Sequence, residues 1–440
     1  MIHWRFWRWG PSNQIIGGFA LGLVAGLMAN LSFGDNPRLL WALDQIFAPI
    51  GEVFLRIIFM IIIPLILSAF ILGIAGLGTM QRLKSMGLRY LIVTLALAMT
   101  LVGAAQLLVI AISPGSYLSD GQRKALTAKY GIEVQDDVAI AREFPGVAPA
   151  LVNLIPDNPV RHLARALTVD DDGAGLPAIL IFSLFVSLAI LVGPDKQMEV
   201  LKSFFRGLFA VSMNIISFAL KLAPICIMFL AFDFGARLGL ELMASMSMYL
   251  ATFTLVILFA FGIVFPSALM LFARRSPWGF YKAIKEPFWF AAATTSSSAT
   301  FPLALRAAKN ELRIPDSISQ FVLTLGAVAN QVGSSIFVAV STVFLAEIFG
   351  VQLGLLEQVQ IFALSVAFTY ATPGVPGGNL PLLASFCLLF GIPPTAVAIV
   401  VSVDRVMDMG VTSVNVVGDL VVSSVLARSE KPSQVTEEAI

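Results

Sequence analysis

Charged side chains are scarce in this sequence. Asp, Glu, Lys and Arg together make up 12% of its 440 residues, whereas about a quarter is usual in soluble domains. Hydrophobic residues reach 58%, and the mean hydropathy is +0.88. This composition excludes an ordinary soluble protein and predicts a chain that crosses a lipid bilayer several times. The formal net charge of +1 gives no electrostatic reason to expect a nucleic-acid partner.

Cysteine and histidine are also rare, with two of each. Cys226 and Cys387 lie in apolar runs, so we expect neither a disulfide framework nor a metal cluster. His3 and His162 lie outside the apolar segments, and the sequence has no Gly-x-Ser-x-Gly motif. A serine hydrolase would lack both its base and its nucleophile turn. We therefore predict that the protein is not an enzyme and rank an intramembrane enzyme last.

Long apolar runs dominate what the chain does contain. Eight windows have the length and composition of membrane-spanning helices, at roughly 13–33, 46–77, 90–113, 175–193, 204–233, 245–273, 317–348 and 394–427. The first follows a basic and aromatic N-terminus. It is long for the apolar core of a signal peptide and shows no convincing cleavage site, so we expect it to be retained.

Two further apolar segments, about 283–305 and 357–393, are interrupted in the middle. The interruptions are TTSSSATFP at 294–302 and TPGVPGGNLP at 372–381. Proline and glycine in series free backbone groups that lipid cannot satisfy. Such backbone is tolerated at membrane depth only where it is buried in protein or lines a cavity. We therefore predict two re-entrant helical hairpins.

Basic residues support this topology. They cluster at Arg5 and Arg8, at Arg82, Lys84 and Arg89, at Lys196, Lys202 and Arg206, at Arg274, Arg275, Lys282 and Lys285, at Arg306, Lys309 and Arg313, and at Arg428 and Lys431. If the first hairpin enters from inside and the second from outside, every cluster and both termini lie in the cytoplasm. The long polar insertion 114–174 then lies outside. The succession of broken hairpin and polar helix occurs twice, as expected for inverted repeats around a midplane site.

The last apolar run carries an unusual polar stripe. Asp404, Asp408, Thr412, Asn415 and Asp419 fall within an arc of about 80° on a helix. One ionised carboxylate at the centre of a membrane helix costs on the order of 2.5 to 3.5 kcal/mol. Three of them predict a pathway for a cation and a solute. The alternative is a structural set that is protonated or paired with Arg405.

Oxygen-bearing groups accumulate elsewhere in this half of the chain. Gly326, Asn330, Asn415 and Asp419 could jointly supply carbonyl, amide and carboxylate oxygens to Na⁺. The hairpin tips at 296–298 and 374–379 offer hydroxyls, backbone N–H groups and half-helix N-termini, which suit a substrate carboxylate. A plain loop is the alternative for either tip alone.

These motifs together resemble a known family. SSSATFP, the Asn-x-x-Gly-Ser of 330–334, GVPGG and Asp-x₃-Asp-x₃-Thr-x₂-Asn-x₃-Asp are similar to the dicarboxylate/amino acid:cation symporters, the glutamate transporter homologues. The likeness spans roughly 280–427, and upstream it rests on topology and size. It implies an all-α membrane protein with eight transmembrane helices and two re-entrant hairpins, which works as an elevator-type homotrimer in the cell (inner) membrane.

The resemblance also implies a division of the chain. Scaffold helices 1 and 2 would occupy 1–77, transport-domain helix 3 would occupy 78–113, and the extracellular insertion would occupy 114–174. Scaffold helices 4 and 5 would occupy 175–244. The transport domain would then fill 245–440, with helix 6, the hairpins at about 283–305 and 357–393, helix 7 at about 317–348, helix 8 at about 394–427 and a short cytoplasmic tail.

Site residues follow from the same resemblance. Asp408 would bind the substrate amino group, with backbone carbonyls of Thr295 and Val375, and Ser297 and Asn415 would bind the carboxylate. The expected substrate site further includes Ser298, Ser334, Asn379, Val411 and Thr412. One Na⁺ site would comprise Gly326, Asn330, Asn415 and Asp419. A second would comprise Gln331 with backbone near Thr369, Tyr370 and Thr372.

Departures from the family pattern refine the prediction. Carriers of acidic amino acids have an arginine at the position of Val411, which pairs with the substrate side-chain carboxylate. A buried carboxylate beside valine would be uncompensated, so we predict a small neutral amino acid as substrate. Val332 stands where the family usually has an aspartate, and Gln331 stands where it has a methionine. Because the loss of the carboxylate weakens or removes a cation site, we expect fewer coupled Na⁺ ions, or a proton in place of one. Members of the family often have an arginine just before the serine run, and this chain has Thr295 there.

Two other readings of the sequence stay open. A dicarboxylate or acidic amino acid could be the substrate if Arg405 swings into the pocket, although Arg405 lies on the flank of the stripe and more plausibly balances Asp404. Asp408 argues against a substrate that lacks an amino group. A channel lined by the polar stripe is the third hypothesis. The closed hairpin tips and the repeat favour alternating access over a channel.

Overall fold

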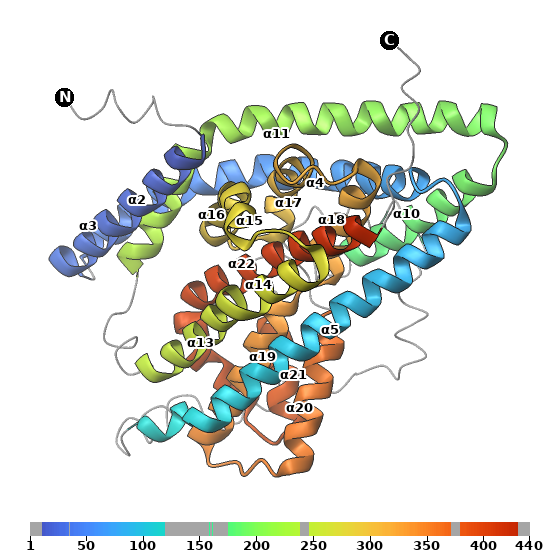
Figure 1. Cartoon of the computed structure of the whole chain (residues 1–440). Helices are drawn as coiled ribbons and strands as arrows, with labels where there is room; N and C mark the ends of the chain where they lie inside the picture. Colours follow the sequence, from blue (N-terminus) through green and yellow to red (C-terminus); the bar gives the residue numbers. More distant parts are fainter. Residues whose placement is uncertain are drawn as a thin grey trace.

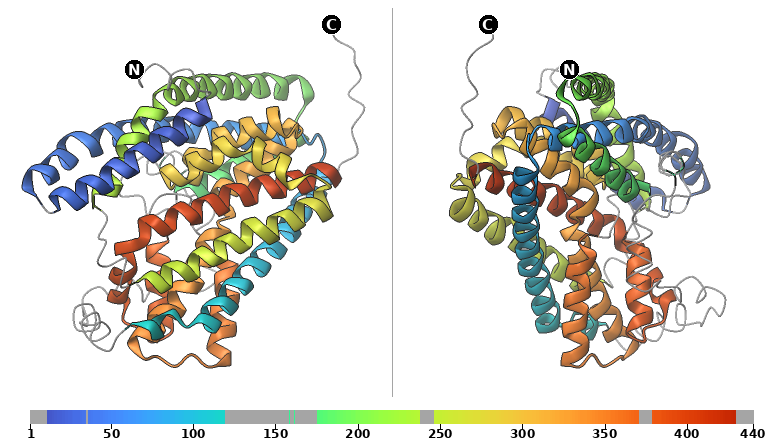
Figure 2. Two further views of the ribbon diagram at one scale, coloured as in Figure 1. Left: turned by 60° about the vertical axis from the view of Figure 1, so that its left-hand side comes forward. Right: turned by 90° about the vertical axis from the view of Figure 1, so that its right-hand side faces the viewer.

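A computed structural model describes residues 11–34, 36–118, 158, 161, 175–237, 246–370 and 379–429. Within these ranges the chain is helical throughout, without a β-strand. Figures 1 and 2 show a layer of N-terminal helices lying across a larger group of helices from the second half of the chain. The predicted all-α class is confirmed for the described residues.

The N-terminal layer consists of six elements. These are α2 (Pro11–Phe33), α3 (Pro37–Ala42), the π-helical turn η1 (Leu43–Phe47), α4 (Ala48–Ala75), α10 (Gly175–Val192) and α11 (Asp195–Arg237). Helix α11 packs along both α2 and α4, and α10 packs against α4. Figure 1 shows α11 running along one edge of the molecule above α4.

The close approach of α2 to α11 depends on glycine. A Cβ atom at Gly18, Gly22 or Gly26 would lie 2.1–2.3 Å from a backbone carbonyl oxygen of α11. Small residues spaced four apart allow helix backbones to approach each other in lipid, where the hydrophobic effect does not drive helices together. This glycine stripe therefore fixes how the first helix lies on α11.

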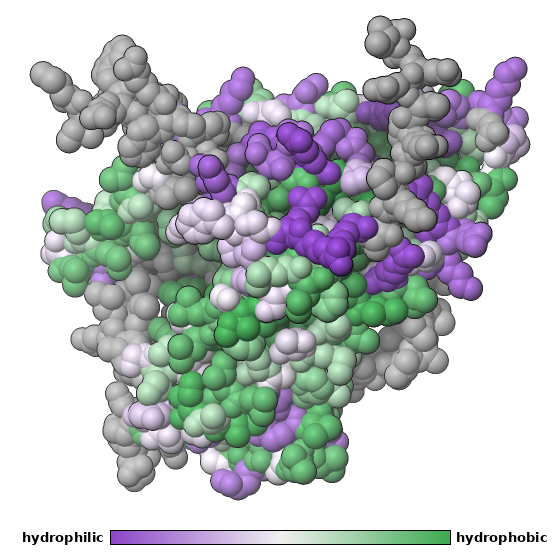
Figure 3. Space-filling model, in the orientation of Figure 1, coloured by the Kyte–Doolittle hydropathy of each residue, from purple (hydrophilic) through white to green (hydrophobic). Residues whose placement is uncertain are grey.

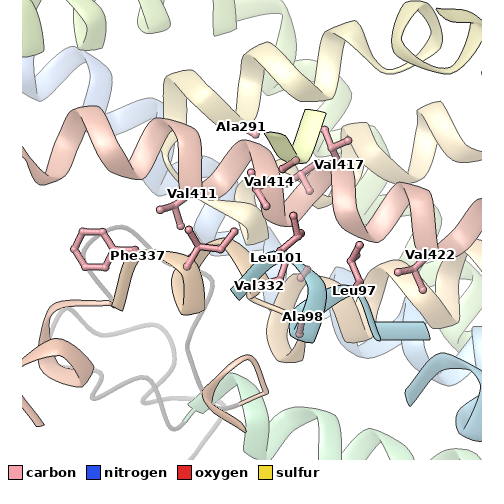
Figure 4. Close-up of a cluster of buried hydrophobic side chains, with 14 of the residues drawn as sticks. Leu97, Ala98, Leu101, Ala291, Val332, Phe337, Val411, Val414, Val417 and Val422 are labelled. Atoms are coloured by element: carbon pink, nitrogen blue, oxygen red, sulfur yellow. The ribbon is translucent and has the colours of Figure 1, made fainter. Parts of the chain in front are cut away.

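The second group is built around α22 (Val397–Ser429). Two rods pack against α22. The first is helix α5 (Met80–Ile112), which is followed by a short turn, η2 (Pro114–Tyr117). The second is continuous and consists of α13 (Ser247–Phe259), η3 (Ala260–Val264), α14 (Phe265–Ala268) and η4 (Leu269–Ala273). Both views in Figure 2 show these three rods side by side. Their buried apolar side chains form one continuous core, and part of it is drawn in Figure 4.

The first predicted hairpin is broken at the predicted place. Helices α15 (Pro277–Ala283) and α16 (Lys285–Thr294) lead to Thr295, and α17 (Ser297–Arg306) and η5 (Ala307–Glu311) lead away from it. Helices α16 and α17 pack against each other. Thr295 adopts φ 49°, a left-handed conformation in which a non-glycine residue is uncommon. For the second hairpin, α20 (Leu355–Phe368) and α21 (Leu380–Leu389) both pack on α19, and the tip lies outside the described residues.

The expectation of one long helix at 317–348 is wrong. The structure divides this segment into α18 (Asp316–Ala329) and α19 (Val332–Phe349), with non-helical backbone at Asn330 (φ −144°, ψ 66°) and Gln331 (φ −95°, ψ 61°). Apolar periodicity continues across the break, so it gave no warning. The Gln331 N–H donates to the Thr369 carbonyl, and the Gln331 side chain donates to the carbonyls of Gly326 and Ala327, which compensates the loss of helical hydrogen bonds.

Two other helices are longer than their apolar windows. Helix α5 begins at Met80 rather than near residue 90, because Thr79 caps it by accepting a hydrogen bond from the Arg82 N–H at 3.2 Å. Helix α11 begins at Asp195 rather than near 204. In both cases charged residues continue the helix beyond the apolar part, where water can solvate them. A short helix, η6 (Pro394–Ala396), precedes α22.

Five helices of the described chain are long and apolar enough to cross a membrane. They cover Met80–Tyr117, Lys196–Ala219, Ser247–Ala273, Asp316–Phe349 and Val403–Arg428. Shorter apolar helices lie at Gly17–Phe33, Ile63–Ala75, Ile181–Val192 and Leu355–Phe368. The presence of several apolar helices of spanning length is thus as expected for a membrane protein. The number of eight transmembrane helices and the sides from which the two hairpins enter the membrane stay predictions.

The glycine stripe on α2 makes a testable prediction. We expect Gly22→Ala to lower the apparent Tm of the detergent-purified protein, because its Cβ would lie 2.1 Å from the Met228 carbonyl oxygen. Forced repacking of this kind costs about 1–3 kcal/mol. Gly207→Ala in α11 is the control, since no atom lies within 4 Å of the added Cβ. Equal Tm values for the two variants would show that α2 does not need the close contact.

Candidate functional site

The break between α18 and α19 faces the polar stripe of α22. Asn330 donates a hydrogen bond from Nδ2 to Oδ1 of Asp419 at 2.7 Å, and no described residue bonds to its own Oδ1. Both residues are buried. A buried carboxylate bonded to an amide, beside a spare amide oxygen, provides the oxygen-rich surroundings that Na⁺ prefers.

Gly326 lies directly beneath this carboxylate. A Cβ atom at Gly326 would meet all three atoms of the Asp419 carboxylate group at 2.2–2.3 Å. Glycine is therefore required here by space and not by a positive φ. The structure thus brings together three of the four residues predicted for the first Na⁺ site. The fourth, Asn415, lies one turn earlier on α22 and accepts a hydrogen bond on Oδ1 from the Gly333 N–H at 2.6 Å.

Gln331 connects this group with the hairpin tip. Its Oε1 accepts hydrogen bonds from Asn415 Nδ2 at 2.6 Å and from Ser297 Oγ at 3.3 Å. Its Nε2 donates to the carbonyl oxygens of Gly326 at 3.2 Å and Ala327 at 3.1 Å. One side chain therefore contacts residues predicted for the substrate carboxylate and a carbonyl predicted for Na⁺.

The first hairpin tip is packed into the same place. Ser296 caps α17 by accepting a hydrogen bond from the Ala299 N–H at 3.1 Å, and Ser298 donates to the Ala327 carbonyl at 3.4 Å. Thr295 is buried, and its Oγ1 has no hydrogen-bond partner among the described residues. Ser297 and Ser298 thus direct their hydroxyls at the α18–α19 junction, whereas Ser296 caps its own helix.

Asp408 lies near the start of the second hairpin's return arm. Asn379 Nδ2 approaches Asp408 Oδ1 at 3.5 Å, and both side chains are buried. Ser334 and Thr412 are also buried. The predicted contact residues Val375 and Thr372 lie outside the described residues. The structure therefore supports the proximity of Asp408 to one of the two hairpins.

Val411 lies in apolar surroundings. It is buried in the same hydrophobic cluster as Val332, and Figure 4 shows both among apolar side chains contributed by α5, α19 and α22. These are the two positions at which the family pattern carries charges of opposite sign. In this chain both are valine, so neither position offers a charge to a substrate or a cation.

The end of α20 joins the junction as predicted for the second cation site. The Gln331 N–H donates to the Thr369 carbonyl at 2.8 Å. Ser335 Oγ and Thr369 Oγ1 share a hydrogen bond of 2.8 Å. The hydroxyl of Tyr370 pairs with Thr94 Oγ1 of α5 at 3.0 Å. Gln331, Thr369 and Tyr370 are therefore close in space.

Helix α5 also contributes polar side chains, which were not expected from the sequence. Tyr90 and Thr94 are buried, and the Tyr90 hydroxyl has no hydrogen-bond partner among the described residues. A polar pair four residues apart in an apolar helix was the available signal, because such residues share one face.

Asp404 is the exception among the three carboxylates of α22. It is 8% exposed, and its Oδ1 has no hydrogen-bond partner. Arg405, which was expected to balance it, is exposed, and no ion pair of the described residues joins the two side chains. Successive residues on a helix point about 100° apart, which explains the separation.

Comparisons with known proteins show which sequences this chain is similar to. A model of the sodium:dicarboxylate symporter family matches residues 12–429. The chain is 25% identical over 423 residues to the proton/sodium-glutamate symport protein of Geobacillus stearothermophilus, which covers 95% of this chain and 94% of the relative. It is 25% identical over 425 residues to the proton/glutamate-aspartate symporter of Escherichia coli K12, with 95% and 92% covered. It is 28% identical over 433 residues to the human neutral amino acid transporter B(0), with 92% and 76% covered.

The contact between Gly326 and Asp419 makes a second prediction. We expect Gly326→Ala to lower the apparent Tm and to remove any stabilisation by Na⁺, because the new Cβ would displace the carboxylate from Asn330. Overpacking of this kind costs about 1–3 kcal/mol. Gly418→Ala is the matched control on α22, since the atom nearest to its Cβ would lie at 3.6 Å. An unchanged response to Na⁺ in Gly326→Ala would exclude this group as a cation site.

Proposed function

Because the chain belongs to the sodium:dicarboxylate symporter family, a family of transport proteins, we propose that it is a secondary active symporter for a small neutral amino acid and Na⁺. The substrate amino group would pair with Asp408, and its carboxylate would take hydrogen bonds from Ser297 and Asn415. Na⁺ would bind among the oxygens of Gly326, Asn330, Asn415 and Asp419. A second cation would bind near Gln331, Thr369, Tyr370 and Thr372.

The hydrogen bonds of Gln331 support the proposal that ion binding and solute binding are coupled. The Gln331 amide donates to the Gly326 carbonyl and accepts from Ser297 and Asn415. Na⁺ at that carbonyl and a carboxylate at those two donors would each displace the same side chain. The free-energy cost of breaking these hydrogen bonds lowers the affinity of the ligand that binds first. The second ligand does not meet this cost, so it binds more tightly. This reciprocal effect is what a symporter requires.

Half-helix ends add to the selectivity of the two positions. The last turn of α18 presents carbonyl groups, including those of Gly326 and Ala327, where the helix dipole favours a cation. The first turn of α19 presents N–H groups, one of which donates to Asn415. The broken helix therefore offers opposite partial charges to the two ligands within one junction.

Val411 supports a neutral side chain on the substrate. It is buried among apolar side chains, so a second carboxylate on the substrate would lose its hydration without gaining a cation there. A small side chain without a charge, such as that of alanine, serine or threonine, avoids this cost. The alternative is a dicarboxylate or acidic amino acid coupled to Na⁺ or H⁺, as the names of the two bacterial relatives say of those proteins. The name of the human relative favours the neutral class for that protein.

The remaining features of the proposal concern the assembly. Transport would follow an elevator mechanism, in which the transport domain of 78–113 and 245–440 moves against the scaffold of 1–77 and 175–244. The protein would be a homotrimer in the cell (inner) membrane, with both termini in the cytoplasm. Val332 in place of a carboxylate favours fewer coupled Na⁺ ions, or a proton in place of one.

Counterflow in proteoliposomes tests the substrate class. We expect alanine, serine or threonine, and not aspartate, to drive uptake that depends on Na⁺. Val411→Arg should shift the preference toward aspartate by at least about tenfold, because a buried ion pair replaces an unpaired charge. Aspartate-driven uptake by the unmodified protein would contradict the argument from Val411.

Asp408→Asn is the companion variant for the amino group. It should abolish recognition of every amino acid, because the ammonium group loses its only charged partner in the proposed site. Unchanged transport would exclude the assignment of Asp408.

Gln331→Met tests the coupling argument. Methionine has a similar shape but cannot make the four hydrogen bonds, so we expect tighter substrate binding without Na⁺ and about a tenfold smaller effect of Na⁺ on the substrate Kd. Substrate Kd values measured with and without Na⁺ give this ratio directly. Gln106→Met is the matched control, because Gln106 is a buried glutamine that bonds to Gln358 instead. If both ligands weaken equally in Gln331→Met, Gln331 is a ligand and not a coupling residue.

A further inference from the structure

The far end of the first hairpin contains a cavity that the proposed transport cycle does not use. It has a volume of about 590 Å³ and lies between α15, α16, α17 and η5. Helix α16 runs from Lys285 at the cavity to Thr294 at the buried tip, so the cavity and the tip occupy opposite ends of the hairpin. Its lining includes three basic and two acidic side chains, Lys282, Lys285, Arg306, Glu286 and Glu311.

Positive charge is in excess around this cavity. Glu286 and Arg306 form an ion pair with each other across the two arms. Lys282 and Lys285 are exposed, and neither ammonium group has an ion-pair partner among the described residues. Glu311 is the one remaining acid of the lining, and Arg274 and Arg275 lie immediately before α15. The cavity therefore suits an anion.

An exposed apolar surface adjoins the basic groups. The apolar rod of α13 to η4 ends at Ala273. Leu271, Phe272 and Trp278 on either side of that end are 69%, 64% and 82% exposed. Figure 3 shows hydrophilic side chains gathered over the upper part of this face, above a mostly apolar lower part. Tryptophan is enriched at the level of lipid headgroups, so the exposed Trp278 beside the lining favours a position of the cavity at the membrane surface.

We propose that this cavity binds the headgroup of an anionic phospholipid. The phosphate would contact Lys282 and Lys285, and the acyl chains would lie along Leu271 and Phe272. Basic pockets at the cytoplasmic ends of transmembrane helices attract such headgroups. A bound lipid would lie against both arms of the hairpin beside the Glu286–Arg306 ion pair, and so would stabilise the base of the hairpin.

The apolar flank distinguishes a lipid from a soluble anion. Free phosphate would need the lysines alone, and its binding would not depend on Trp278 or Phe272. A phospholipid combines both contacts, and burial of its chains contributes additional free energy of binding. The proposal does not depend on which amino acid or cation the protein transports.

Titration of the purified full chain in a neutral detergent tests the proposal. The probes are dioctanoylphosphatidylglycerol, dioctanoylphosphatidylcholine and inorganic phosphate, and the readout is the apparent Tm. We expect a saturable rise with phosphatidylglycerol only. Lys282→Gln combined with Lys285→Gln should weaken the apparent affinity about 30-fold, from the typical contribution of two basic residues near a lipid surface. Glu311→Gln should strengthen it.

Lys84→Gln combined with Lys196→Gln is the matched control. It removes two exposed lysines from α5 and α11 that do not line the cavity, and should leave the lipid response unchanged. Trp278→Ala should weaken binding of phosphatidylglycerol. An equal loss in the control would indicate diffuse electrostatics, and an equal response to phosphate would indicate a soluble-anion site. Either result, or no response to phosphatidylglycerol, would overturn the proposal.

Discussion

A carboxylate surrounded by apolar side chains must be compensated by its neighbours, and this requirement organises the second half of the molecule. Asp419 receives a hydrogen bond from Asn330, and Asp408 is approached by Asn379. Both amides come from points where a helix is interrupted or begins. An intact apolar helix would have its backbone groups bonded internally and could offer little to a charge. The broken helices and the polar stripe of α22 therefore depend on each other.

Close backbone approach is the second consequence of this arrangement. Gly326 lies beneath the Asp419 carboxylate, and a Cβ at Gly333 would lie 2.3 Å from the Val411 carbonyl oxygen. Glycine on both sides of the break lets α18 and α19 contact α22 without intervening side chains. The same device joins α2 to α11, where three glycines meet backbone carbonyls. In lipid, such contacts replace the hydrophobic driving force that packs helices in water.

The two valines, Val332 and Val411, leave the α19–α22 contact without a charge at either position. Both are buried in one apolar cluster (Figure 4). A charged side chain at either position would need its own compensation at membrane depth. Asp404 retains one buried oxygen that has no hydrogen-bond partner among the described residues.

Sequence alone indicated a helical membrane protein, because composition, apolar length and the polar stripe are local properties. It also placed an interruption of the first hairpin at 294–302 and grouped Asn330 with Asp419. The symporter family and the grouping of Gln331 with Thr369 came from the resemblance of its motifs. Only the tertiary structure revealed the interruption at Asn330 and Gln331, since apolar periodicity continues across it. The recruitment of Tyr90 and Thr94, and the four hydrogen bonds of Gln331, likewise depended on which helices meet. Such contacts join residues far apart in the chain, and no local pattern encodes them.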